Sequence, residues 1–127
     1  MVITDRYFDS SIAYQGAGRV LQPAEVARIS RWATESLAPV LTVILDVPAS
    51  VGLGRLQSQD RLESEPLTFH ERVRQEFLSL ANTNPDRFFV VDATQSKEAI
   101  HEQIIERVGH ISKLKVNKKA RTKNDRF

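Results

Sequence analysis

The sequence contains no cysteine, which excludes disulfide bonds and metal sites that need a thiolate. It has no apolar run near the ~20 residues that a membrane-spanning helix requires. Its first residues also lack the basic-then-apolar pattern of a secretory signal, so we expect a cytoplasmic protein without membrane contact. The three histidines are not spaced as metal ligands, and no Ser/His/Asp constellation is recognisable.

The residues that are present suffice for one domain. The 127 residues are 41% hydrophobic and 27% charged, which is typical of a globular protein. The charge is uneven: residues 113–126 hold seven Lys or Arg and one Asp, whereas residues 1–112 hold eleven Lys or Arg and fifteen Asp or Glu. We predict a domain over residues 1–112 and a basic, disordered tail over residues 113–127, because the tail has few apolar side chains to pack. We do not expect it to bind nucleic acid, although a weak polyanion contact stays open.

Short apolar runs rich in β-branched residues predict three strands, at residues 2–4, 41–45 and 88–91. The second and third runs are continuous, which is typical of strands buried on both faces of a parallel sheet. An acidic residue follows each run: Asp5, Asp46 and Asp92.

Apolar residues at helical spacing lie between and after these runs. One helix is expected to start near Pro23 and another after Pro48, since proline is favoured in a first helical turn. Thr68 and Glu71 form a capping box for a third helix, and Ser96 is a candidate cap for a fourth. The alternation of strand and helix predicts an α/β fold with a parallel sheet. The expected apolar stripes are Val26, Ile29, Ala33 and Leu37; Val51, Leu53 and Leu56; Phe69, Val73, Phe77 and Leu80; and Ile100, Ile104, Val108 and Ile111.

Open α/β sheets bind ligands at the carboxyl ends of their strands. Asp5 and Arg6 directly follow the first predicted strand, where a carboxylate can approach a Mg²⁺-nucleotide and a guanidinium can bind phosphate. Hydroxyl, amide and aromatic groups follow within one short stretch, and such groups suit a pyrimidine nucleotide. Residue types alone leave alternatives open, in which Asp5 and Arg6 form a surface ion pair. Ser10 and Ser11 would then cap a helix, and Tyr14 would fill the core.

The run DRYFDSSIAYQGAGR at residues 5–19 resembles the DRY-x-x-SS-x-AYQG-x-GR segment of bacterial thymidylate kinases. Further similar segments follow in the family's order (LTVILDVP, VGL, DRLE, FHERVR, FL and VDA), so the resemblance extends over about the first 110 residues. It implies a P-loop NTPase-like fold with three α/β/α layers around a parallel sheet. It also implies transfer of a phosphoryl group from ATP to dTMP, with Mg²⁺ accompanying ATP, and a homodimer when the enzyme is full length.

The resemblance also implies which residues bind dTMP. Arg6 would bind the dTMP phosphate, and Asp5 would lie near the phosphate and the metal ion. The ring of Tyr14 would pack on the deoxyribose and crowd a ribose 2′-hydroxyl, which favours dTMP over ribonucleotides. The expected substrate-binding residues are Arg6, Asp9, Ser10, Ser11, Tyr14 and Gln15.

The ATP side is implied by two later segments. Residues 57–65 match a lid over ATP whose arginines approach the transferred phosphoryl group, and residues 92–95 match a loop beside the adenine. An arginine that arrives when the lid closes can stabilise the negative charge on the transferred phosphoryl group while the lid excludes water. Without the resemblance, ion pairs with nearby acids would explain the arginines of this region. The expected ATP contacts are Arg55, Arg61, Ala93 and Thr94, and the expected catalytic residues are Arg6, Arg61, Arg55 and Asp5.

One motif of the family has no counterpart here: the printed sequence contains no G-x-x-x-x-G-K-[ST] phosphate-binding loop. In the family's sheet, the strand before that loop lies between the strands matching residues 2–4 and 41–46, so we expect an incomplete sheet with a central gap. We expect a fragment without ATP:dTMP kinase activity of its own. One alternative is a non-catalytic nucleotide-binding module whose basic tail contacts nucleic acid or a partner. A deoxynucleoside kinase shares the Asp-Arg pair, but the YQG stretch favours the monophosphate kinase.

Overall fold

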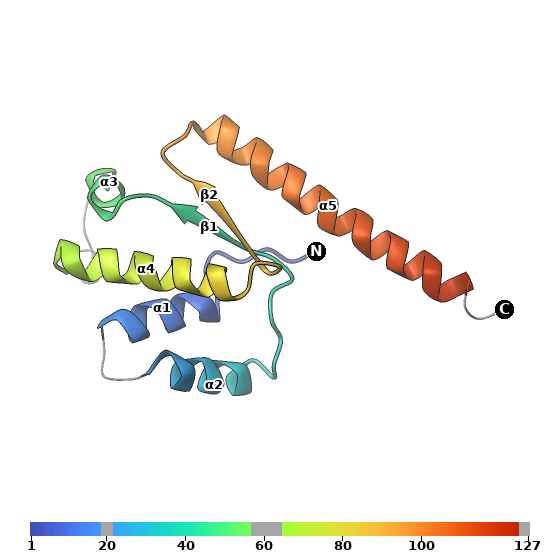
Figure 1. The fold of residues 1–127 in the computed structure, drawn as a ribbon, viewed down its shortest axis with the longest axis horizontal. Coiled ribbons are helices and arrows are strands. Elements are labelled where there is room, and N and C mark those ends of the chain that lie inside the picture. Colours follow the sequence, from blue (N-terminus) through green and yellow to red (C-terminus); the bar gives the residue numbers. More distant parts are fainter. Residues whose placement is uncertain (19–21, 57–64, 125–127) are drawn as a thin grey trace.

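The computed structural model describes residues 1–18, 22–56 and 65–124 (Figure 1). The predicted lid and its Arg61 therefore lie outside the described residues, apart from Glu65. The elements follow one another as α1 (Phe8–Gly18), α2 (Pro23–Ala33), β1 (Thr42–Asp46), α3 (Ala49–Gly54), α4 (Leu67–Thr83), β2 (Phe88–Asp92) and α5 (Lys97–Asn124).

The two strands, β1 and β2, form a parallel sheet, which confirms the predicted fold class. Parallel strands cannot be joined by a tight turn, and the chain between these two contains α3 and α4. The register pairs Thr42 with Phe88 at one end and Asp46 with Asp92 at the other. The two acids that end the apolar runs are therefore neighbours at the carboxyl edge of the sheet.

The prediction of a strand at residues 2–4 is wrong. No strand of the described chain includes these residues, and Val2 and Ile3 are almost fully exposed. A strand needs a neighbour that satisfies its backbone N–H and C=O groups, and among the described residues β1 pairs with β2 alone. The β-propensity of this short run is not enough without such a partner.

The prediction that both strands are buried on both faces is also wrong. Ile44 and Phe88 are buried against Ala81 of α4, and Val91 is fully buried. Leu45, however, is 55% exposed and Val90 is 40% exposed. The described sheet has only two strands, so both of its long edges lie near the surface and cannot enclose every apolar side chain.

Among the described residues, three small clusters of buried side chains form the core, and α4 contributes to all of them. The predicted stripe of α4 is confirmed, because Phe69 and Val73 are buried against α1 while Leu80 contacts the cluster between α1 and α2. This arrangement holds α1 between α2 and α4. The buried members of the clusters are Ile12, Val26 and Ala27; Ala13, Phe69 and Val73; and Ile44, Ala81 and Phe88.

The capping box predicted for α4 is not formed. The helix begins at Leu67 with Pro66 as its N-cap, so Thr68 already lies within the first turn. Proline presets a backbone that suits the entry to a helix, which moves the start upstream of Thr68. The carboxylate of Glu71 instead accepts hydrogen bonds from Arg74 and Gln75.

The helix predicted from Pro23 is shorter than its stripe suggests. α2 ends at Ala33, and Glu35 and Ser36 follow with positive φ angles of 52° and 61°, which no continuing right-handed helix permits. Val26 is buried as predicted, but Ile29 is exposed within the helix, and Leu37 lies beyond the helix and is exposed as well.

The last helix, α5, starts where the sequence predicts, since the Ser96 hydroxyl accepts a hydrogen bond from the Ala99 amide at 3.2 Å. The stripe of Ile100, Ile104, Val108 and Ile111 is half-buried rather than buried, because the two-stranded sheet covers only part of it. The helix continues to Asn124, so the backbone of residues 113–124, expected to be disordered, is helical and projects past the sheet (Figure 1). Among the described helices, none combines the length and apolarity needed to cross a bilayer.

Candidate functional site

Arg6 and Tyr14, two residues of the predicted substrate site, lie together. Arg6 has a φ angle of 63°, in the left-handed region that side chains other than glycine rarely occupy. Such strained residues concentrate at binding sites. The guanidinium carbon of Arg6 lies 5.4 Å from the centroid of the Tyr14 ring, within the range of a cation–π contact. Arg6 is nevertheless exposed, so its charge can reach a ligand.

The Tyr14 ring is held in place by α4. Its centroid lies 6.2 Å from the ring of Phe69 and 6.3 Å from that of Phe77, in tilted and edge-on orientations. Tyr14 is half-buried, so one part of the ring packs in the core while the remainder can contact Arg6 or a ligand. The first predicted strand is absent, but the packing of α1 on α4 still supports the aromatic part of the site.

The remaining polar candidates on α1 are Ser10, Ser11 and Gln15. Ser11 and Gln15 are exposed and Ser10 is half-buried. Residues three or four positions apart share a helix face, which places Ser11 beside both Tyr14 and Gln15 and places Ser10 beside Tyr14. The helix therefore places the two candidate hydroxyls beside the Tyr14 ring and the Gln15 amide beside Ser11.

Asp9 lies elsewhere, and its geometry does not support a substrate-binding role. The residue is buried, with 3% of its surface exposed. Both carboxylate oxygens accept hydrogen bonds from Arg87, at 2.8 and 2.9 Å, and the Thr42 hydroxyl donates a third at 3.1 Å. The side chain of Arg87 in turn lies over the ring of Phe88, at 4.3 Å. With its charge neutralised and both oxygens occupied, Asp9 ties α1 to the sheet.

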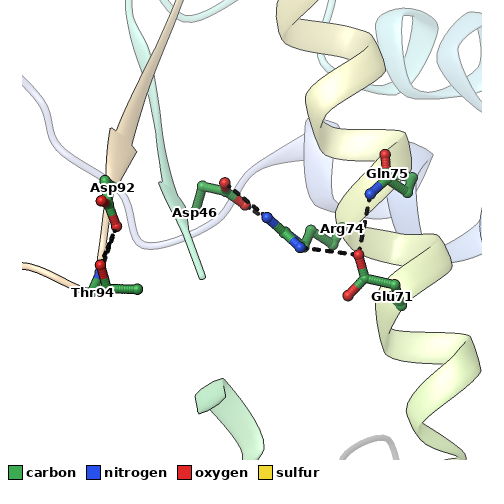
Figure 2. Close-up of polar contacts among 6 residues, drawn as sticks. All are labelled: Asp46, Glu71, Arg74, Gln75, Asp92 and Thr94. Carbon is green, nitrogen blue, oxygen red and sulfur yellow. Dashed lines mark hydrogen bonds and ion pairs between the residues drawn. The ribbon is translucent and has the colours of Figure 1, made fainter. Parts of the chain in front are cut away.

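A cluster of ionic contacts lies at the carboxyl edge of the sheet (Figure 2). Arg74 of α4 donates from Nε and Nη2 to the two carboxylate oxygens of Asp46, at 2.8 and 3.2 Å. Its Nη1 donates to Glu71 at 3.0 Å, and Gln75 donates to the same Glu71 oxygen at 3.1 Å. The sequence indicated the acid at the end of β1 but not its partner, because Arg74 follows it by 28 positions.

The electrostatics of this cluster follow from its hydrogen bonds. The bond to the Asp46 carboxylate, with the charge of that group, raises the pKa of the Arg74 guanidinium. Hydrogen bonds, first that from the Gln75 amide, lower the pKa of the Glu71 carboxyl. Both shifts favour the charged forms of Arg74 and Glu71.

The loop after β2 brings two of the predicted ATP contacts together. Arg55, the C-cap residue directly after α3, donates from Nη1 to the Ala93 carbonyl at 3.1 Å. Ala93 is buried, and its backbone amide donates to the Asp46 carbonyl at 2.8 Å, so both of its backbone polar groups have partners. The Thr94 hydroxyl and amide donate to Oδ1 of Asp92 at 2.6 and 2.9 Å (Figure 2), and these bonds lower the pKa of the Asp92 carboxyl.

The described residues contain no group of three or more His, Cys, Asp or Glu side chains that could by themselves hold a metal ion. Mg²⁺ in nucleotide sites is commonly bound by one or two carboxylates together with substrate phosphates. The exposed carboxylate of Asp5, next to Arg6, fits that mode of binding.

Comparison with known proteins identifies the family. A family model described as thymidylate kinase matches residues 1–104. A thymidylate kinase of Cutibacterium acnes is 50% identical over 108 residues, which is 85% of this chain and 53% of that protein. One of Clavibacter michiganensis subsp. michiganensis is 53% identical over 104 residues (79% and 49% of the two chains), and one of Latilactobacillus sakei subsp. sakei is 48% identical over 111 residues (84% and 52%).

The chain spans about half the length of the curated relatives it matches. The match nevertheless covers most of this chain, including the segment with Arg6 and Tyr14 and the segments that form β1, α4 and β2. The resemblance that the order of motifs indicated is thereby confirmed, and the chain belongs to the thymidylate kinase family.

Proposed function

We propose that this chain provides the dTMP site of a thymidylate kinase, which transfers the terminal phosphoryl group of ATP to dTMP and releases ADP and dTDP. The observation that best supports this proposal is the placement of Arg6. Arg6 has a strained backbone, and its exposed side chain places the guanidinium over the Tyr14 ring. Both residues lie within a run that matches the family. A positive charge beside an aromatic ring suits a nucleoside monophosphate. The charge suits its phosphate, and the ring suits the apolar surface of its nucleoside.

On the dTMP side, each residue has a distinct role in this proposal. The Arg6 guanidinium binds the dTMP phosphate through two hydrogen bonds. The Tyr14 ring packs on the deoxyribose, where a ribose 2′-hydroxyl would collide with it. Ser11, with Ser10 and Gln15 beside it, binds the polar edge of thymine. Asp9 stabilises α1 and does not contact the nucleotide.

On the ATP side, positioning and positive charge carry the reaction, because phosphoryl transfer needs little covalent help from the protein. Arg55 and Arg61 approach the transferred group, and the loop at Ala93 and Thr94 borders the adenine. Asp5 would hold Mg²⁺ together with the nucleotide phosphates. That ion, when bound, supplies positive charge that screens the phosphates from one another.

Turnover also needs a phosphate-binding loop, and the 127 residues contain no G-x-x-x-x-G-K-[ST] motif. We therefore expect the chain alone to bind dTMP without converting it to dTDP. Formation of dTDP by the purified chain would contradict this expectation. Homodimerisation, which the resemblance implies for the full-length enzyme, stays a prediction. Light scattering, which measures the molar mass in solution, can check it.

The proposal is tested by calorimetric titration of the chain with dTMP and, in parallel, with thymidine, which lacks the phosphate. We expect Arg6→Ala to lower dTMP affinity about 10- to 100-fold, the range for a lost hydrogen-bonded charge. Thymidine affinity should change less than about twofold, since only the phosphate contact is lost. Arg28→Ala, on the exposed surface of α2, is the matched control. Equal dTMP affinity in Arg6→Ala and the unmodified chain would refute the assignment.

The alternative of a non-catalytic module with a basic tail makes a different prediction. Such a module would bind DNA with an affinity that falls steeply with salt and depends on residues 113–127. Fluorescence anisotropy with labelled duplex DNA, with and without those residues, separates the two proposals. The kinase proposal expects no tail-dependent binding at physiological salt.

A further inference from the structure

We propose that Arg74 is a positioning residue for the dTMP side of the site. By binding Asp46 at the end of β1, it fixes the part of α4 that holds the Tyr14 ring (Figure 2). The inference rests on the proposed function for its meaning in dTMP binding, whereas the contacts between these residues do not depend on that function.

Two hydrogen bonds join Arg74 to the last residue of β1. Its Nε and Nη2 donate to the two carboxylate oxygens of Asp46, at 2.8 and 3.2 Å, and both side chains are largely sheltered from solvent. A bidentate contact of this kind fixes the direction of approach as well as the distance. Among the described residues, no other side-chain hydrogen bond joins β1 to α4.

The third nitrogen of the guanidinium is bound within α4. Nη1 donates to Glu71 at 3.0 Å, and Gln75 donates to the same Glu71 oxygen at 3.1 Å. These bonds orient the Arg74 side chain toward Asp46 without linking it to a further element. Because each of its three nitrogens has a carboxylate partner, we assign Arg74 no direct contact with a nucleotide phosphate.

The Tyr14 ring lies against the segment of α4 that contains Arg74. Its centroid is 6.2 Å from that of Phe69 and 6.3 Å from that of Phe77, and Arg74 comes between these two residues on the helix. Val73, next to Arg74 in the chain, is buried in the same cluster as Phe69. A shift of this segment therefore moves the side chains that hold Tyr14.

Apolar packing attaches α4 to the sheet nearer its other end. Ala81 is buried with Ile44 of β1 and Phe88 of β2, and Phe77 and Leu80 pack against that cluster. Apolar contacts are not directional, so by themselves they leave the first half of α4 free to tilt about this point. The Arg74–Asp46 pair supplies a second attachment, and two attachments together fix the orientation of the helix.

The orientation of α4 matters for the nucleotide because β1 ends at the carboxyl edge, where open α/β sheets bind their ligands. The Tyr14 ring, proposed to pack on the deoxyribose, has the Arg6 guanidinium 5.4 Å from its centroid. Arg74 therefore sets how the nucleoside part of the site lies relative to this edge.

The first test follows the Tyr14 ring by NMR without any nucleotide, since neighbouring aromatic rings shift its proton signals. We expect Arg74→Met to shift these signals and Arg28→Met, which removes an exposed arginine of α2, to leave them unchanged. Arg74→Lys should shift them partway, because an ammonium cannot reproduce the fork of a guanidinium. Asp46→Asn weakens the same contact from the other side, which keeps the test decisive if Arg74→Met does not fold.

The second test is calorimetric titration with dTMP and with thymidine. Arg74→Met should lower the affinity for both about fivefold, as expected if about one fifth of the molecules keep the ring in its binding position. Arg6→Ala, in contrast, should affect dTMP far more than thymidine. In a Tyr14→Ala chain, adding Arg74→Met should lower dTMP affinity by less than about a further twofold, because the ring through which Arg74 acts is already gone.

Tyr14 signals that stay unchanged in both Arg74→Met and Asp46→Asn would overturn the inference. A fivefold loss of dTMP affinity in the Tyr14→Ala chain would also overturn it, because a general weakening of the fold acts with or without the ring. An unmodified chain that does not bind dTMP would refute the proposed function instead. The NMR measurement would then still decide whether Arg74 fixes the Tyr14 ring.

Discussion

Asp9 and Arg87 lie 78 positions apart in the sequence and form an ion pair with two hydrogen bonds, of 2.8 and 2.9 Å. The Asp9 side chain is 4% exposed and that of Arg87 is 23% exposed. The Thr42 hydroxyl donates to the same carboxylate, so the contact joins α1 to β1 and to the residue just before β2. α1 contains the polar and aromatic residues of the proposed dTMP site, and this pair fixes its distance from the sheet.

Removal of one partner should therefore destabilise the whole fold. We expect Arg87→Met to lower the free energy of unfolding by about 3 kcal/mol, because it leaves a buried carboxylate without its counter-charge. Urea denaturation followed by circular dichroism measures the change, and Arg28→Met should lie within about 0.5 kcal/mol of the unmodified chain. The double variant Asp9→Asn/Arg87→Met should lose less than the sum of the two single variants. Additive losses would show that the two residues do not interact.

Arg6 should show a conflict between stability and binding. Its φ angle of 63° is unfavourable for arginine and favourable for glycine. We expect Arg6→Gly to raise the free energy of unfolding by about 1 kcal/mol, as relief of left-handed backbone predicts. The same change should remove most of the dTMP affinity, which calorimetry measures. Arg6→Ala should lose the affinity without gaining stability, and a gain of stability in both variants would argue against backbone strain at this position.

Tyr14 should decide between deoxyribose and ribose. The ring is fixed by Phe69 and Phe77, so it cannot easily move away from a 2′-hydroxyl. We expect Tyr14→Ala to reduce the preference for dTMP over its ribonucleotide analogue about tenfold, the scale of a lost steric contact. Tyr14→Phe keeps the ring and should retain the preference. The ratio of the two dissociation constants is the measurement, and a ratio unchanged in Tyr14→Ala would contradict the role proposed for the ring.

Asp92 should titrate at a pH that Thr94 controls. The Thr94 hydroxyl is the first cause of the lowered pKa of Asp92, and its backbone amide is the second. The folded pKa lies below the unfolded value of about 4. These bonds therefore add to stability above that pH, and their contribution is lost as the pH falls through the folded pKa. Thr94→Val should raise the pKa of Asp92, whereas Thr94→Ser should keep it low.

The Asp92 titration is followed by NMR of its carboxyl carbon. Only the hydroxyl bond is removed in Thr94→Val, so the pKa should rise partway to its ordinary value and not beyond it. An Asp92 pKa that is the same in the unmodified chain and in Thr94→Val would mean that the hydroxyl has no effect on this carboxylate.

Several secondary-structure elements and the family of this protein can be predicted from its sequence alone. The apolar runs that form β1 and β2, the stripe of α4 and the Ser96 cap are local patterns, and each is confirmed. The family also follows from the sequence, because several motifs occur in one order. Local patterns succeed here because the apolar stripe of a helix and a short run of β-branched residues are both visible within a few neighbouring positions of the chain.

Other features were decided only by the tertiary structure. Residues 2–4 have the composition of a strand but form none, because a strand exists only beside a partner. Asp9 has the position of a substrate ligand in the family pattern, yet it is buried against Arg87. Arg74 has no local signal that pairs it with Asp46. Ion pairs and strand pairs join residues that are distant along the chain, and no spacing in the sequence records which of these meet in space.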